Sequence, residues 1–515
     1  MRLLPTLLVL AACGSGPDDP VKCKQSSWFI DADGDGFGDP QSEDAGCDQP
    51  DEGVHDNTDC DDSDPDAHPG GAEVYYDGID QACDGLDDEW DQDGDGYTVG
   101  GGPSPTALLD CDDTDPDIHP DVVINGDDQL ATANTPALAN APWIASQGAE
   151  LRLGPVQNVD QHHATVALGD DGTFLLAWQA GSLDQAEAYT QHFDLDGTAL
   201  ANPVRLNDVD DTGGKPDVEF DGTGYWVTWQ DNQGSVYLKR FGRDGSPQGA
   251  SIAVYESSFE AEGPDLALLP DGTVRVVWNV DSIPNETGRD YYRSYDIDGT
   301  PLTDVLVAAV TGRSVADAVG LPDGHFVVVG TNKDSPPDGQ VAEVYGRIIG
   351  PDRCVTQFRA DQGVSDFPSR PAVAAGPDGT FAVTWRNKID SENADGVYTR
   401  FFQPDGRAIT DQIALSPLPN DGNRAVVAFA GSDAFFSWQS TRIGPGNDVA
   451  SVAIDAATGD FSVAEYSQNA DETANHDRPA IATGLEAGDP ILVTVWEASV
   501  VPDKIILGRV TRFSR

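Results

Sequence analysis

The chain has 515 residues and a formal net charge of −60, from 89 acidic residues against only 29 lysines and arginines. Its length allows several domains, and the missing basic footprint argues against nucleic-acid binding. The charge is uneven, because residues 14–121 contain 33 aspartates and glutamates but only two lysines. This split predicts two parts of the chain with different roles.

Residues 1–12 are typical of an export signal, with Arg2 followed by a mostly apolar stretch. That stretch is too short to span a bilayer as a mature helix. The end of the signal, Leu10-Ala11-Ala12-Cys13, resembles the bacterial lipobox. The resemblance implies cleavage before Cys13 and its acylation, which would anchor the exported protein by lipid to the cell envelope, at the outer membrane or cell surface. The alternative is an ordinary signal peptide with an incidental cysteine. Residues 13–27 are predicted to form a flexible tether.

An aspartate pattern occurs twice in residues 28–121. The sequence Asp31-Ala-Asp33-Gly-Asp35-Gly-Phe37 returns as Asp91-Gln-Asp93-Gly-Asp95-Gly-Tyr97, and an Asp-Cys-Asp-Asp-x-Asp-Pro segment follows each copy. Alternating carboxylates form a compact shell of hard oxygen donors, which suits the six to eight oxygen ligands of Ca²⁺. Without a cation these charges would repel one another. The alternative is a solvated acidic linker.

Neither loop is a standard EF-hand, because Ser42 and Gly102 occupy the loop position that an EF-hand fills with glutamate. Gly34 or Gly36 would permit the sharp turn in the first loop, and Phe37 would offer a backbone carbonyl. The downstream Asp-Cys-Asp-Asp segments are expected to supply the missing ligands. The predicted ligands for several Ca²⁺ ions are Asp31, Asp33, Asp35, Phe37, Asp39, Asp59, Asp61, Asp62, Asp64, Asp80, Asp84, Asp91, Asp93, Asp95, Tyr97, Asp110, Asp112, Asp113 and Asp115.

The run from Asp59 to Glu73, continued from Asp77 to Gly85, resembles the MopE-type metal-binding motif of exported proteins from myxobacteria and related bacteria. It is also similar to thrombospondin type 3 calcium repeats. The resemblance covers residues 28–120 and implies calcium-loaded, loop-rich repeats that serve as stalks or spacers. The second copy departs from the motif, since it stops at Pro120 and lacks the later segment with its cysteine.

The name of this family is associated with copper, which is a second reading of the motif. His68 and His119 occupy matching places before prolines, and histidine is a common transition-metal ligand. An exposed histidine in a repeated turn explains the same positions. The many acidic oxygen donors favour Ca²⁺ over copper.

The chain contains seven cysteines, and six remain when Cys13 is lipidated. An exported chain meets oxidising conditions, so disulfides are expected. Proximity favours the pairs Cys23–Cys47 and Cys60–Cys83, which leaves Cys111 and Cys354. The full pairing stays open, because six cysteines allow fifteen connectivities. A cysteine-ligated zinc site is disfavoured by the absence of a CxxC pair.

Residues 122–147 are a low-charge segment that is predicted to be a linker. Residues 148–515 then repeat a unit of four short strands with Asp-Gly turns, about every fifty residues. A marker tryptophan recurs once per unit, and Gly330 replaces it in the fourth unit. The markers are Trp178, Trp229, Trp278, Trp385, Trp438 and Trp496. This pattern predicts an all-β chain, with a seven-bladed β-propeller after a small, loop-rich, Asp-rich calcium-binding module.

Closure of the ring is predicted from its two ends. The last unit ends after its third strand, and residues 150–154 resemble the fourth strand of other units, so they are expected to complete the last blade. The repeated tryptophans are expected to pack between blades. Arginines that recur at one place on the third strand are expected to be structural for the same reason, and they are Arg240, Arg347, Arg400 and Arg509.

No strong catalytic signature is present among the common hydrolase, nucleotide-binding and metalloprotease motifs. His162 and His163 beside Asp160 form the most unusual polar cluster, and we expect them near a channel mouth. A metal or acid–base role competes there with a plain loop histidine pair. The many aspartates leave a catalytic carboxylate pair open but do not locate one.

The sequence therefore predicts a calcium-binding surface lipoprotein, more plausibly non-enzymatic, whose propeller binds an extracellular protein or polysaccharide in adhesion. Two alternatives remain at this stage. One is a surface glycan hydrolase or lyase on the propeller scaffold, and the other is a transition-metal (copper) binding protein. Propellers host many activities, so the fold alone does not decide among them.

Overall fold

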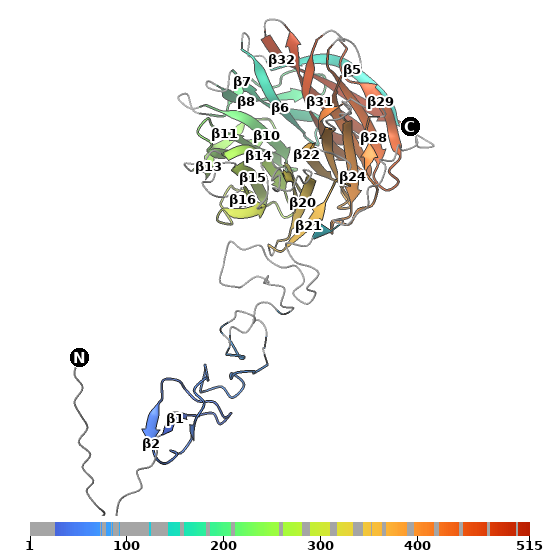
Figure 1. Ribbon diagram of the computed structural model, residues 1–515. Helices are drawn as coiled ribbons and strands as arrows, with labels where there is room; N and C mark the ends of the chain where they lie inside the picture. The colour runs from blue at the N-terminus through green and yellow to red at the C-terminus, as the bar shows by residue number, and fades with distance from the viewer. Residues whose placement is uncertain are drawn as a thin grey trace, which may run out of the picture. The chain divides into compact units, whose positions relative to one another are not determined.

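The computed structural model describes residues 26–72, 74, 79–83, 85, 92, 123–124, 143–154, 159–181, 186–207, 212–256, 261–280, 289–309, 317–332, 343–351, 353–362, 367–388, 396–416, 422–441, 446–470, 474–500 and 503–515 (Figure 1). All the regular elements that these residues form are β-strands. Among them there is no helix that is long and apolar enough to cross a membrane. The chain divides into two compact units, Met1–Gly96 and Tyr97–Arg515.

The first unit is built on a small antiparallel sheet. β1 (Ser26–Ile30) pairs with β2 (Asp44–Gly46) on one side and with β3 (Gly53–Val54) on the other. Phe29 is the buried apolar side chain of this sheet. A Cβ at Gly38 would lie 2.8 Å from the Val54 side chain, so glycine allows the chain to cross the sheet closely. So small a core needs further support from a metal or a disulfide.

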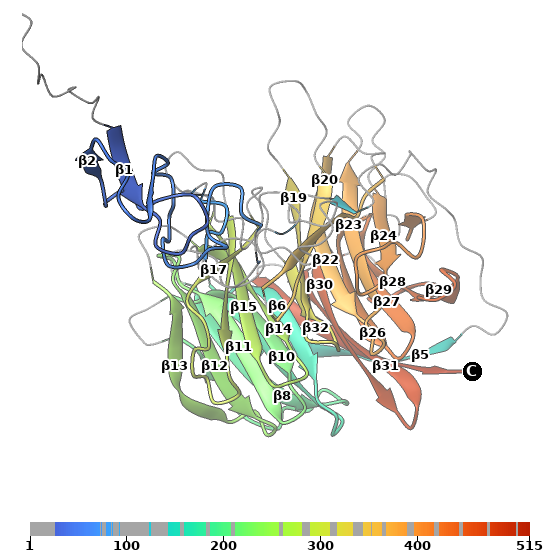
Figure 2. The same cartoon turned by 90° about the horizontal axis from the view of Figure 1, so that it is seen from below.

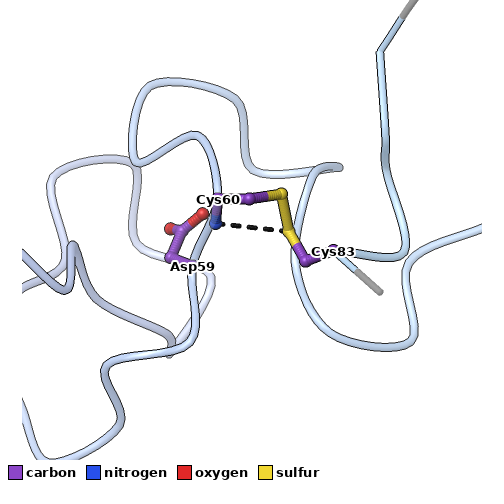
Figure 3. Close-up of side chains that lie close together, drawn as sticks. All are labelled: Asp59, Cys60 and Cys83. Atoms are coloured by element: carbon purple, nitrogen blue, oxygen red, sulfur yellow. Dashed lines mark hydrogen bonds between the residues drawn. A yellow bond between two sulfur atoms is a disulfide. The ribbon is translucent and has the colours of Figure 1, made fainter. Parts of the chain in front are cut away.

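A disulfide supplies part of that support. Cys60 and Cys83 are bonded, with their Cα atoms 5.5 Å apart, which confirms the pairing predicted from proximity (Figure 3). Cys47 is also disulfide-bonded. Cys23, its predicted partner, lies outside the described residues. Each crosslink limits the unfolded chain and so stabilises a unit that buries little apolar surface.

The described strands of the second unit form seven sheets of four or five strands. In hydrogen-bonding order the first four are β6 (Gln161–Leu168), β7 (Thr173–Ala180), β8 (Glu187–Asp194) and β9 (Val204–Arg205); β10 (Gly214–Phe220), β11 (Gly224–Gln230), β12 (Val236–Gly242) and β13 (Pro247–Tyr255); β14 (Ala261–Leu268), β15 (Val274–Val280), β16 (Arg289–Tyr295) and β17 (Leu306–Ala309); β18 (Asp317–Gly320), β19 (Phe326–Asn332), β20 (Glu343–Ile349), β21 (Val355–Arg359) and β4 (Val123–Ile124). The other three are β22 (Phe367–Ala375), β23 (Phe381–Lys388), β24 (Gly396–Phe402) and β25 (Ile413–Ala414); β26 (Asn423–Ala430), β27 (Asp433–Ser440), β28 (Asp448–Asp455) and β29 (Phe461–Ser467); β30 (His476–Glu486), β31 (Asp489–Val500), β32 (Asp503–Ser514) and β5 (Ile144–Leu153).

These sheets form a propeller. The first strand of each sheet contacts the first strand of the next, and β30 of the last sheet returns to β6 of the first. The first strands therefore line the centre of a closed ring, as two perpendicular views show (Figure 1 and Figure 2). The predicted fold class, an all-β propeller after a small loop-rich module, is confirmed.

The ring closes through strands from its two ends, as predicted. β5 runs antiparallel to β32, with Leu153 opposite Ile506 and Glu150 opposite Arg509. In Figure 2 the cyan strand β5 lies in the same sheet as the red strands at the end of the chain, although the other sheets come between them in sequence. Without β5 the last sheet would have three strands and an open edge.

The predicted linker, residues 122–147, is partly a component of the propeller. β4 pairs in parallel with β21, and β5 begins at Ile144. The Trp143 backbone N–H donates to Ser462 O at 2.7 Å, and its indole N–H donates to Asp433 Oδ2 at 3.0 Å. The propeller therefore starts earlier than residue 148. The segment carries little charge, and its apolar and polar residues alternate only weakly. Its strands are held mainly by backbone pairing, so the sequence does not reveal them.

The marker tryptophans pack inside the ring, as predicted. All six lie on the second strands of their sheets, and none is more than 2% exposed. Four of them stack on a tyrosine of the neighbouring third strand, for example Trp178 on Tyr189 with centroids 5.7 Å apart. Gly330 faces Tyr345 in the sheet that lacks the tryptophan. Such aromatic pairs contribute about 0.5–1.5 kcal/mol each beyond the area they bury.

The repeated arginines also have structural roles. Arg240 pairs with Asp221 and lies over Trp226 in its own sheet, 4.9 Å from the ring centroid. Arg400 Nε donates to Thr410 O at 2.9 Å, also within one sheet. Because these arginines make their contacts within their own sheets, we infer that they stabilise the fold and do not take part in catalysis.

Candidate functional site

The first aspartate loop is held by hydrogen bonds to its own backbone. Asp31 accepts from the N–H of Gly34 at 2.7 Å and from that of Gly36 at 3.1 Å. Both glycines have positive φ, 89° and 103°, which other residues rarely adopt. The sheet fixes the ends of the loop, since Asp31 N–H donates to Glu52 O and Asp39 N–H donates to Ile30 O. The alternation of Asp and Gly thus curls the chain around its carboxylates.

Three carboxylates of the first unit gather close together. Asp33, Asp35 and Asp59 accept a backbone N–H with Oδ1, at 3.2, 2.8 and 2.8 Å respectively. Their Oδ2 atoms are buried and have no hydrogen-bond partner. Oxygens of the three side chains lie within 4.8 Å of one another. A buried polar atom without a partner costs about 1–3 kcal/mol, so three together call for a cation.

A second group shares one member with the first. Oxygens of Asp31, Asp33 and Asp62 also lie within 4.8 Å of one another, and Asp62 accepts the N–H of Ala32 at 2.8 Å. Residues 59–62 thus reach back to the first loop, as the sequence predicts. The structure therefore brings together five of the predicted ligands from two segments, with Asp33 common to both groups.

The electrostatics of these groups also favour a cation. Burial raises the pKa of Asp33, and the charges of Asp35, Asp62 and Asp31 add to it, while a backbone hydrogen bond opposes the shift. The pKa of Asp59 is raised by burial and by the same kind of neighbours. A positive charge close to these carboxyls would favour their ionised forms and lower their pKa values.

Other predicted ligands lie outside both groups among the described residues. Asp61, Asp64 and Asp39 accept backbone N–H groups two residues further on, and they form local turns. Asp80 accepts the N–H of Gly85 at 3.0 Å. The ring of Phe37 stacks on His68 with centroids 5.1 Å apart. The remaining predicted positions lie outside the described residues, and they are Cys13, Cys23, Asp84, Asp91, Asp93, Asp95, Tyr97, Asp110, Cys111, Asp112, Asp113, Asp115 and His119.

Asp59 also lies beside two sulfur atoms. Oxygen and sulfur atoms of Asp59, Cys60 and Cys83 fall within 4.8 Å of one another (Figure 3). The sulfurs are bonded to each other, whereas metal-binding cysteine is a thiolate. The disulfide therefore positions the Asp59 segment and does not itself offer soft ligands.

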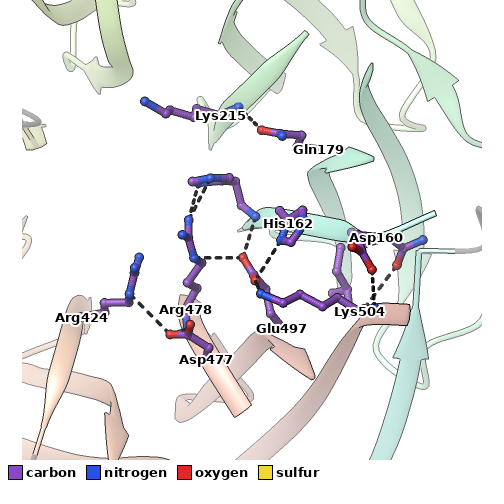
Figure 4. A network of polar contacts seen from close by, with 12 residues as sticks. Asp160, His162, Gln179, Lys215, Arg424, Asp477, Arg478, Glu497 and Lys504 are labelled. Atoms are coloured by element: carbon purple, nitrogen blue, oxygen red, sulfur yellow. Dashed lines mark hydrogen bonds and ion pairs between the residues drawn. The ribbon is translucent and has the colours of Figure 1, made fainter. Parts of the chain in front are cut away.

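A second polar cluster lies in the propeller, where the paired histidines meet Glu497. His162 Nδ1 is 3.2 Å from Glu497 Oε2, and the His163 backbone N–H donates to Oε1 at 3.0 Å (Figure 4). Burial would raise the pKa of Glu497, but these contacts and the charge of Arg478 lower it. Burial and Arg478 lower the pKa of His163 to about 3, so its ring is neutral at physiological pH.

Three aspartates form a third cluster, which the sequence interpretation did not locate. Asp217, Asp265 and Asp317 occupy equivalent places on β10, β14 and β18, and Asp265 hydrogen-bonds to the other two. Burial raises the pKa of all three carboxyls, that of Asp317 to about 6. The charges of its two neighbours raise the pKa of Asp265 further, to well above its usual range. The available signal was Pro-Asp at one place in two neighbouring repeats, Pro216-Asp217 and Pro264-Asp265.

Comparison with known families gives one match, in the acidic region. Residues 59–89 and 110–123 match Cu-binding_MopE, described as a "Putative metal-binding motif". The matched residues include Asp59 and Asp62 of the two groups. The loop of Asp31, Asp33 and Asp35 precedes them. No curated protein matches the chain.

Solved structures share only a distant likeness with this chain. A protein of unknown function from Dyadobacter fermentans is 12% identical, with 72% of this chain and 99% of that chain covered and a TM-score of 0.44. A fungal alcohol oxidase in complex with copper is 10% identical, with coverage of 72% and 76% and a TM-score of 0.46. An N11 neuraminidase-like protein of an influenza virus from a flat-faced bat is 11% identical, with coverage of 75% and 98% and a TM-score of 0.42.

Proposed function

We propose that the first unit binds Ca²⁺ through Asp31, Asp33, Asp35, Asp59 and Asp62. The observation that carries the proposal is the close approach of Asp33, Asp35 and Asp59, whose buried Oδ2 atoms have no hydrogen-bond partner among the described residues. Their Oδ1 atoms are already held by backbone N–H groups, so the carboxylates are oriented before an ion arrives. A bound cation would neutralise the repulsion among these side chains and join residues 31–35 to residues 59–62.

Calcium fits this donor set better than copper does. The groups offer carboxylate oxygens, which hard cations prefer, whereas copper sites favour imidazole and sulfur ligands. His68 stacks on Phe37, and among the described residues no histidine belongs to the groups that converge. The name of the matched motif points to copper, so both metals belong in the test.

Calorimetric titration of the mature protein with Ca²⁺ and with Cu²⁺ tests the metal. We expect saturable Ca²⁺ binding that Asp33→Asn and Asp59→Asn weaken by about tenfold or more, since each removes a charged ligand. Asp51→Asn, an exposed residue of the same unit, is the matched control and should bind as the wild type does. Tight binding of Cu²⁺ with no binding of Ca²⁺ would show that this is a copper site and would contradict the calcium proposal.

We propose further that the protein is an exported lipoprotein, anchored through Cys13 to the bacterial outer membrane or cell surface. Its propeller would bind an extracellular protein or polysaccharide in adhesion. The lipobox-like sequence supports the anchor, and the channel of the propeller supports ligand binding. Labelling with a fatty acid tests the anchor: label should enter the wild type and be lost in Cys13→Ser. Label that persists in the variant would contradict it.

A second candidate, a glycan hydrolase or lyase, is favoured by the cluster of Asp217, Asp265 and Asp317. A carboxyl with a raised pKa can act as a general acid, because it holds its proton at a higher pH than an ordinary aspartate does. A turnover screen over acidic and neutral glycans would detect such activity. Turnover that disappears in Asp265→Asn would support the enzyme, while binding without turnover supports the adhesive role.

A further inference from the structure

The first strands of five consecutive sheets carry a basic residue at the same place. Each residue lies in the β-bulge near the start of its strand, where the pairing with the second strand shifts register. The sheets follow one another around the ring, beginning with that of β22 and ending with that of β10. The residues, which we call the basic ring, are Arg370, Arg424, Arg478, His163 and Lys215.

The backbone of the basic ring is strained. All five residues have positive φ, between 45° and 53°, which is uncommon for any residue except glycine. Gly263 fills the equivalent place on β14 with φ 56° and shows that the bulge itself needs only a glycine. The chain instead keeps five basic side chains there against the preference of the backbone. Strain of this kind gathers at functional sites.

The basic ring lines a cavity of about 380 Å³ at one end of the channel. This is the end at which the second strand of each sheet leads into the third, because the bulges face the last residues of the second strands. A cavity of this volume admits a group the size of one sugar. Figure 4 shows Lys215, Arg424 and Arg478, which reach this region from three different sheets.

The cations of the basic ring are incompletely neutralised. Lys215 pairs with Glu262 at 3.4 Å, Arg424 with Asp477 at 3.4 Å, and Arg478 with Glu497 at 3.3 Å. Arg370 differs, because it donates to the neutral Asn423 side chain at 2.7 Å and has no acidic partner among the described residues. The three arginines come from neighbouring sheets, so their charges repel one another, and an anion between them would relieve that repulsion.

The acidic residues of the cavity cancel only part of this charge. Asp265 and Asp317 are its acidic lining residues, and Asp265 shares hydrogen bonds with two other carboxyls. The raised pKa values of the two carboxyls reduce their negative charge, so they offset the cations less than ordinary aspartates would. The chain as a whole carries a charge of −60 and repels anions, so a bound anion requires a local basic site.

We propose that the basic ring binds the carboxylate or sulfate group of an acidic sugar, with Arg370, Arg424 and Arg478 as its main partners. Guanidinium groups match such oxyanions with paired hydrogen bonds. The inference deepens the proposed ligand-binding role of the propeller and rests on it, but it is independent of the calcium site. It assigns the ligand to the acidic polysaccharides.

The test measures the affinity of the full mature protein in calcium for three probes. They are an oligogalacturonate, a sulfated galactan oligosaccharide and a neutral galactan oligosaccharide. We expect one or both acidic probes to bind and the neutral probe to fail. Arg370→Gly should weaken the binding by about tenfold or more, the effect of losing hydrogen bonds to a charged group. Arg370→Lys should retain part of it.

Two controls separate binding from folding. Arg370→Gly should melt no lower than the wild type, because glycine relieves the positive φ. Arg407→Gln removes one charge from an exposed turn of the same sheet and should bind as the wild type does. Equal affinity of wild type and Arg370→Gly for the acidic probes, or no anion binding in either, would overturn the site. Binding of inorganic sulfate that Arg370→Gly abolishes, without oligosaccharide binding, would uphold the site and overturn the polysaccharide role.

Discussion

At the scale of single residues, the same side chain type has opposite roles in the two units. In the first unit, aspartates that accept backbone N–H groups converge as candidate metal ligands. In the propeller, Asp217, Asp265 and Asp317 converge on one another, and Asp265 hydrogen-bonds to the other two. Sequence spacing predicts the first arrangement because its ligands are two residues apart. The second arrangement brings together aspartates that are about fifty residues apart in sequence, and they meet only because neighbouring repeats pack against one another.

The channel carboxyls predict a pH dependence of the propeller. The pKa values of these carboxyls are raised, that of Asp317 to about 6. Glu219 faces the same channel. Burial there, together with the charges of Asp217 and Asp317, raises the pKa of Glu219 to about 8. The folded state therefore holds protons that the unfolded chain releases above about pH 4. Stability should fall as the pH rises from about 5 to about 8.

Melting curves of the propeller at pH 5 and pH 8 check this dependence. The wild type should melt higher at pH 5. Asp265→Asn removes the titrating group at the centre of the cluster, and the amide oxygen can still accept the Ala318 N–H, whose nitrogen lies 2.5 Å from Asp265 Oδ2. The variant should lose most of the difference between the two pH values. An unchanged difference would show that these carboxyls are not coupled.

At the scale of elements, the sequence predicts strands well where apolar residues alternate and less well where they do not. The Trp period and the Asp-Gly turns locate the sheets, and residues 150–154 are correctly assigned to the last one. β4 and the first residues of β5 are missed, because Ile144 is exposed and its strand is mostly polar there. The metal groups show the same limit. The Asp loop is predicted, but the path of residues 59–64 decides that Asp59 and Asp62 lie beside it while Asp61 and Asp64 do not.

The closing strand should contribute strongly to stability. Leu153 of β5 is 1% exposed and packs in the core between the last and first sheets. Leu153→Ala should lower the free energy of unfolding of the propeller by about 2–5 kcal/mol, the usual cost of such a cavity. Urea denaturation followed by tryptophan fluorescence measures it. Arg152→Ala, an exposed neighbour on the same strand, is the control and should cost little.

At the scale of the whole molecule, two units rest on different sources of stability. The propeller has a continuous apolar interior and a closed ring of sheets. The first unit has a three-stranded sheet, at least one disulfide and a set of converging carboxylates. Calcium should therefore control the order of the first unit and leave the propeller almost unaffected.

Limited proteolysis with and without a chelator checks this division. In calcium we expect residues 26–85 to resist cleavage, because the ion joins segments that otherwise repel. In chelator this region should be cut while a propeller fragment survives. A variant with both Asp33→Asn and Asp59→Asn should show the chelator pattern even in calcium. Identical cleavage of the wild type in both conditions would contradict a structural role for the metal.

The pairing of β5 with β32 also sets an order of events during synthesis of the chain. Gln147 of β5 accepts a hydrogen bond from Arg509 of β32, and the two residues are 362 positions apart. The early strand must wait for its partner until every sheet between them has been made, and such distant pairings form slowly. A chain whose synthesis stops before β32 cannot close the ring. Closure thus separates finished molecules from truncated ones before either meets a ligand.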